Sequence, residues 1–127
     1  MTSSRLNILC VSQMPASPPR FGAQARMHGL MTELARNHDL TAVMLADDDF
    51  DIAACQRAMQ SYCRDVVLIR NPYGRAGASK RVLQIRSLVS SRSFDRLRVM
   101  VPAFQQALDR VLRSQRFDLV NLEFPYL

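Results

Sequence analysis

Short apolar runs alternate with longer segments of helical periodicity along this chain of 127 residues. The apolar runs are brief and hardly interrupted by polar side chains, which is typical of buried β-strands. They span residues 6–12, 40–46, 66–69 and 117–122. Because the runs are apolar throughout and do not alternate with polar residues, they favour a parallel sheet covered by helices on both faces.

Four segments between and after these runs carry apolar residues at helical spacing. Residues 23–37 place four of them on one face: Met27, Leu30, Met31 and Leu34. Asp51 is suited to cap a second helix, and further helices are predicted over residues 79–91 and 102–115. The order β-α-β-α-β-α-α-β predicts an α/β fold: a Rossmann-like, doubly wound, mostly parallel sheet of about four strands with flanking helices.

Length and composition fit a single soluble domain. The chain is 48% hydrophobic and 22% charged, and its uncharged apolar stretches fall far short of the roughly 20 residues that cross a bilayer. The N-terminus lacks the features of a signal peptide, so a cytoplasmic protein is expected. Three cysteines without CxxC spacing, and two histidines outside any metal-binding motif, predict reduced buried thiols and no metal site.

Residues 13–26 hold the most informative pattern for chemistry. They follow the first predicted strand and lead into a helix N-terminus, where backbone N–H groups and the helix dipole attract anions or sugar hydroxyls. Gly22 would let a ligand approach the backbone closely, and Arg26 could contact a phosphate. The alternative is that Gly22 only permits the turn and Arg26 is solvated.

The same segment carries a family resemblance. Ile-Leu-Cys-Val-Ser is followed by Pro-Pro-x-x-Gly-x-x-x-Arg, a helix ending Leu-x-x-His, and a strand beginning Asp-Leu-Thr-Ala-Val. Near the end, Arg-Phe-Asp-Leu-Val-Asn-Leu-Glu is similar to a strand commonly written Phe-Asp-hydrophobic-Val-His. In this order, the motifs resemble the N-terminal domain of family 4 (group 1) glycosyltransferases of the GT-B fold.

The resemblance covers residues 1–127 and implies a partial, acceptor-side domain, incomplete relative to the full GT-B N-terminal domain and without the C-terminal donor domain. In such enzymes a sugar passes from a nucleotide-sugar to a glycan or lipid-linked acceptor. The donor would be bound in the full enzyme, so this chain alone is expected to bind no cofactor and to be inactive. Catalytic residues are not assigned. The expected substrate-binding residues are Arg20, Phe21, Gly22 and Arg26, with Phe21-Gly22 standing where the family often has Gly-Gly.

An acidic turn, Asp47–Asp49, follows the second predicted strand. An acidic residue at this distance could bind a ribose, and an Asp-x-Asp pair could bind a divalent ion. The chain lacks the G-x-G-x-x-G fingerprint that normally accompanies the first role. A solvated loop is the simpler interpretation.

Positive charge is concentrated in one segment. Residues 64–98 hold nine basic and two acidic residues, a net charge of +7, whereas the whole chain carries +6. The predicted helix within it carries a basic amphipathic patch: Lys80, Arg81, Arg86 and Arg92. Such a patch fits peripheral contact with the inner face of a membrane, while nucleic acid is disfavoured because the segment has few aromatic residues and no recognised motif. An arginine-rich solvated face is the alternative.

The leading hypothesis is therefore a glycosyltransferase acceptor half that acts in surface polysaccharide synthesis. The alternative is a non-catalytic α/β binding module that acts through its basic face on a membrane surface or a nucleic acid. A homodimer is also expected, because an exposed apolar edge on the last strand would invite pairing with a second copy.

Overall fold

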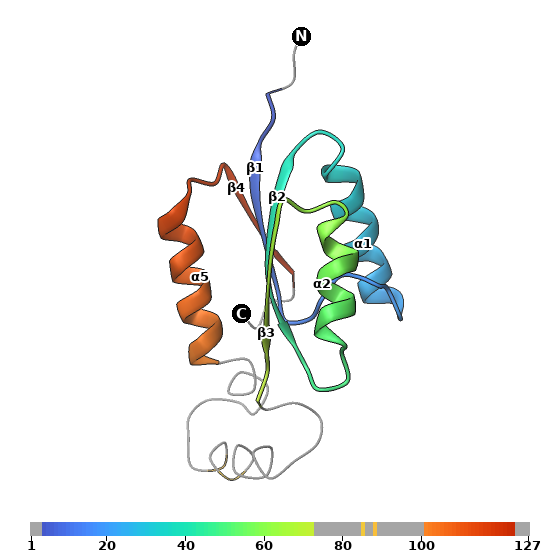
Figure 1. Cartoon of the computed structure of the whole chain (residues 1–127), viewed down its shortest axis with the longest axis vertical. Coiled ribbons are helices and arrows are strands. Elements are labelled where there is room, and N and C mark those ends of the chain that lie inside the picture. Colours follow the sequence, from blue (N-terminus) through green and yellow to red (C-terminus); the bar gives the residue numbers. More distant parts are fainter. Residues whose placement is uncertain (1–3, 73–84, 86–87, 89–100, 124–127) are drawn as a thin grey trace.

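Four parallel strands form the centre of the molecule, in the order β3-β2-β1-β4 (Figure 1). In this computed structural model, which describes residues 4–72, 85, 88 and 101–123, the strands are β1 (Asn7–Ser12), β2 (Asp39–Ala46), β3 (Asp65–Arg70) and β4 (Leu119–Glu123). The helices are α1 (Gly22–Leu34), α2 (Ile52–Gln60) and α5 (Pro102–Ser114). The predicted α/β, Rossmann-like class is confirmed.

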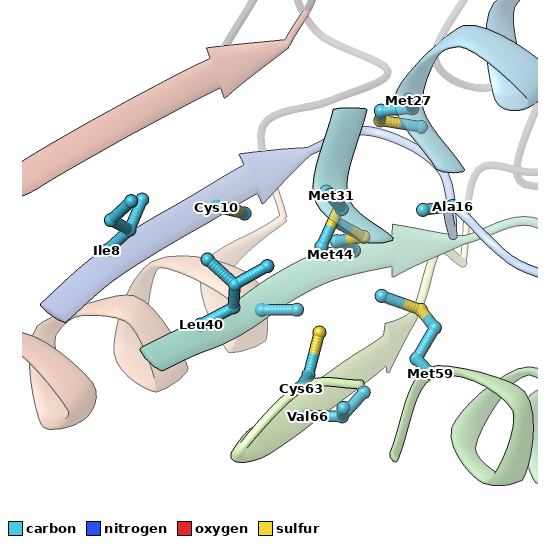
Figure 2. Packing of buried hydrophobic residues seen from close by; sticks show 11 residues of the cluster. Ile8, Cys10, Ala16, Met27, Met31, Leu40, Met44, Met59, Cys63 and Val66 are labelled. Atoms are coloured by element: carbon cyan, nitrogen blue, oxygen red, sulfur yellow. The ribbon is translucent and has the colours of Figure 1, made fainter. Parts of the chain in front are cut away.

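The helices cover both faces of the sheet, as the apolar strands predicted. Alternate residues of β1 and β2 point to opposite faces. On one face they pack against methionines of α1 and α2, in the cluster shown in Figure 2, whose members include Ile8, Cys10, Met27, Met31, Leu40, Met44 and Met59. On the other face Leu9, Val11, Val43 and Leu45 pack against Phe104 of α5.

The central strands β1 and β2 are almost completely buried, but β3 and β4 are not. Both lie at the edges of the four-stranded sheet, so each has one strand neighbour among the described residues. In β4 the side chains of Leu119, Val120 and Leu122 are exposed. The prediction of strands buried on both faces is therefore correct for the central pair only.

Some predicted boundaries differ from the structure for local reasons. The first helix was expected over residues 23–37 but ends at Leu34, and Leu30, expected on its buried face, is exposed. The last strand starts at Leu119, two residues later than expected, and just before it the backbone N–H of Asn7 donates to the Asp118 carboxylate at 2.8 Å. The helix predicted over residues 79–91 lies largely outside the described residues.

Candidate functional site at the carboxyl edge of the sheet

The carboxyl ends of all four strands meet at one edge of the sheet, the lower edge in Figure 1. In open parallel sheets this is the edge at which ligands bind. The loop that follows β1, residues 13–21, lies here and leads into the N-terminus of α1. The residues that the sequence singled out for substrate binding, Arg20, Phe21, Gly22 and Arg26, are therefore all at or next to this edge.

Gln24 of α1 holds the loop at both ends. Its side chain is fully buried, its amide nitrogen donates to the carbonyl oxygen of Pro15 at 2.6 Å, and its amide oxygen accepts from the backbone N–H of Arg20 at 3.0 Å. Sequence reasoning missed this residue because glutamine in a helix is normally solvent-exposed. The loop thus has a defined shape set from within α1.

A second set of contacts fixes the middle of the loop. The buried Ser17 hydroxyl lies 2.6 Å from Nδ1 of His28 and also contacts the hydroxyl of Tyr62, and the two rings meet edge to face. Burial raises the pKa of Tyr62 to about 12, although its hydrogen bond to Ser17 acts in the opposite direction. The Tyr62 hydroxyl thus completes a hydrogen-bonded network with Ser17 and His28 that holds the middle of the loop.

Arg20 connects this loop to the acidic turn after β2. Its guanidinium contacts the backbone carbonyl and the carboxylate of Asp49 at 3.2 and 3.3 Å, and it lies over the ring of Phe50. Asp47 accepts a hydrogen bond from the Asn71 amide at 3.1 Å. The acidic turn is thus bound to neighbouring loops, and the described part of the chain has no group of three side chains that could hold a metal ion.

Arg26 meets a residue at the far end of the chain. From the exposed surface of α1 its guanidinium forms an ion pair with the carboxylate of Glu123, which is buried at the end of β4. The Asn121 amide lies 3.4 Å from the other carboxylate oxygen of Glu123. The sequence predicted that Arg26 is either solvated or available to bind a phosphate. The ion pair with Glu123 was not predicted, because nothing in the local sequence brings positions 26 and 123 together.

Phe21 and Gly22 are both exposed to solvent. A Cβ atom added at Gly22 would meet no atom within 4 Å, and the residue has no left-handed backbone conformation. Local sterics therefore do not require glycine for the turn. Phe21, at the N-cap position of α1, offers no side-chain cap and is 45% exposed. Together they leave an open backbone and an aromatic face at the helix N-terminus.

Two of the three cysteines, Cys10 and Cys63, are buried in the core with raised pKa values. Burial raises the pKa of Cys10 to about 11, and the nearby Glu123 carboxylate acts in the same direction. Burial likewise raises the pKa of Cys63 to about 12. Since the thiolate is the reactive form, these thiols are inert at neutral pH, in agreement with their place in the core cluster of Figure 2.

Comparisons with protein families, curated proteins and solved structures found no match. A shallow hollow elsewhere, along α5, is lined by Gln106, Asp109, Arg110, Arg113 and Ser114 and lies away from this edge.

Two sequence predictions concern membranes. Among the described residues, no helix combines the length and apolar character needed to cross a bilayer. The basic patch of Lys80, Arg81, Arg86 and Arg92 lies outside the described residues. Of the basic segment, Arg64 and Arg70 are described; Arg70 donates to the carbonyl oxygens of Asp47 and Phe50 at 3.0 and 3.1 Å, which ties the end of β3 to the acidic turn.

Proposed function

We propose that this chain is the acceptor-binding half of a glycosyltransferase that moves a sugar from a nucleotide-sugar to a glycan or lipid-linked acceptor in surface polysaccharide synthesis. The observation that carries the proposal is the hydrogen-bonded loop at the carboxyl edge, which leads into the exposed Phe21 and Gly22, about one helical turn before Arg26, the partner of Glu123. Sugars are bound by an apolar or aromatic surface together with a few fixed polar groups. This edge offers that combination.

The loop contacts support the proposal because they hold the site in shape before a ligand arrives. Ordering a loop on binding costs free energy, and a loop already fixed by Gln24 and Ser17 avoids most of that cost. The proposed role is binding and orientation of the acceptor. Catalysis would need the donor domain, so the chain alone is proposed to be inactive.

A titration tests this function. The chain is titrated calorimetrically with UDP-glucose and GDP-mannose as donor probes and with maltose, cellobiose and mannobiose as acceptor probes. Binding of an acceptor probe is expected, and Phe21→Ala should weaken it about tenfold while Leu30→Ala, an exposed leucine on the same helix, leaves it unchanged. No binding of any probe, even when a donor domain is supplied, would overturn the proposal.

The charge segregation of the sequence favours a second candidate, a non-catalytic module that binds an anionic membrane surface. Residues 64–98 carry the whole positive excess of the chain. This candidate predicts flotation with vesicles of phosphatidylglycerol but not of phosphatidylcholine, and loss of flotation at high salt. Vesicle binding together with sugar binding would indicate a membrane-associated glycosyltransferase half, whereas vesicle binding alone would favour the module.

A further inference from the structure

Glu123 is the one buried acidic residue in the part of the chain that the structure describes. It ends β4 at the carboxyl edge, opposite Ser12 of β1 in the parallel register. Its side chain is only 9% exposed, whereas that of its partner Arg26 is 63% exposed. A buried carboxylate is thus paired with a solvated cation at the site described above.

The fold gains little from this arrangement. Removing a carboxylate from water is costly, and an ion pair with a solvated arginine recovers only part of that cost. An apolar side chain at the end of β4 would serve packing at least as well. Glu123 lies at the carboxyl edge, where parallel sheets bind ligands, and this position suits a role in binding.

The carboxylate of Glu123 also has unused capacity to accept hydrogen bonds. A carboxylate can accept about four. Among the described residues, Arg26 contacts one oxygen, and the Asn121 amide approaches the other at 3.4 Å, which is long for a hydrogen bond. The negative charge beside Arg26 disfavours a phosphate at this position. Neutral hydroxyl groups, which donate hydrogen bonds, fit it.

We propose that the Glu123 carboxylate accepts hydrogen bonds from ring hydroxyls of a neutral sugar, and that Arg26 is a positioning residue that orients this carboxylate. This assignment rests on the proposed function and specifies the chemistry of its ligand. It also changes the expected role of Arg26. The sequence predicted a direct contact with a phosphate, whereas here Arg26 affects sugar binding by orienting Glu123. The hydroxyls could belong to the donor sugar or to the acceptor glycan.

A coupling cycle tests the contact with Glu123. The tightest-binding probe from the nucleotide-sugars and disaccharides above is compared with its monodeoxy analogues, on the wild-type chain and on Glu123→Gln. Removing the hydroxyl bound by Glu123 should weaken binding to the wild type about 10- to 100-fold, and should have little further effect on Glu123→Gln. Coupling seen with the nucleotide-sugar analogues would indicate that Glu123 binds the donor sugar. Coupling seen with the disaccharide analogues would indicate that it binds the acceptor. If Glu123→Gln does not fold, Glu123→Asp takes its place.

The role of Arg26 has its own readout. Arg26→Gln should weaken sugar binding, and Arg26→Lys should restore part of it, because a cation at this position again attracts the Glu123 carboxylate. Wild-type binding with no coupling between Glu123 and any hydroxyl would overturn this inference and leave the proposed function standing. Absence of binding by the wild type to every probe would overturn both.

Discussion

At the scale of single residues, burial governs the pKa values of two core thiols, Cys10 and Cys63. Burial raises the pKa of Cys10 from 9.0 to about 11 and that of Cys63 from 9.0 to about 12. In the unfolded chain the two thiols lose their protons first. The contribution of the two protonated thiols to the free energy of unfolding is therefore complete below pH 9. This contribution is lost as the pH rises toward 11 to 12.

The direction of these two pKa shifts predicts how the stability of the protein changes with pH. Between pH 9 and 10.5 the free energy of unfolding should fall more steeply in the wild type than in a Cys10→Ala/Cys63→Ala variant, by up to about 1.4 kcal/mol per pH unit for each thiol. Urea denaturation at several pH values measures the free energy of unfolding of both proteins as a function of pH. The difference between the two proteins at pH 7 reports the packing lost on substitution. Parallel slopes in the two proteins would contradict the burial of these thiols.

At the scale of elements, the loop after β1 depends on one side chain of α1. Gln24→Ala should destabilise the chain by about 1–3 kcal/mol, because the Pro15 carbonyl and the Arg20 N–H both lose their partner. Gln105→Ala on α5 is the matched control: its amide contacts Asp109 on an exposed surface, and its loss should change stability by less than about 0.5 kcal/mol. Thermal or urea unfolding distinguishes the two, and equal losses would refute the role given to Gln24.

The elements themselves were largely predictable from the sequence. Solid apolar runs located the strands, and Asp51 was correctly assigned as a helix cap, since its carboxylate accepts from the backbone N–H of Ala54. The exposed apolar edge expected on the last strand agrees with the place of β4 at one end of the sheet order, whereas nothing in the sequence indicated that β3 lies at the other end. The Arg26–Glu123 pair could not be predicted either, since 97 positions separate the two residues and only the strand order brings them together.

At the scale of the whole molecule, the edge strand β4 is the surface through which two copies of the chain are expected to associate. Among the described residues β4 pairs with β1 alone, and Leu122 on it is 60% exposed. A homodimer through this edge is expected, as proposed from the sequence. Leu122→Lys should shift sedimentation at high concentration toward the monomer, whereas Leu30→Lys on α1 should not. A wild-type chain that sediments strictly as a monomer would contradict this expectation.

Nuclear magnetic resonance can test the proposal that the carboxyl edge of the sheet binds a sugar. The isotope-labelled chain is titrated with the disaccharide probes, and the backbone amide shifts are followed. The shifts are expected to concentrate at residues 13–22, at Arg26 and at Glu123, with α5 unaffected. Shifts confined to α5, or no shifts at saturating disaccharide, would contradict it.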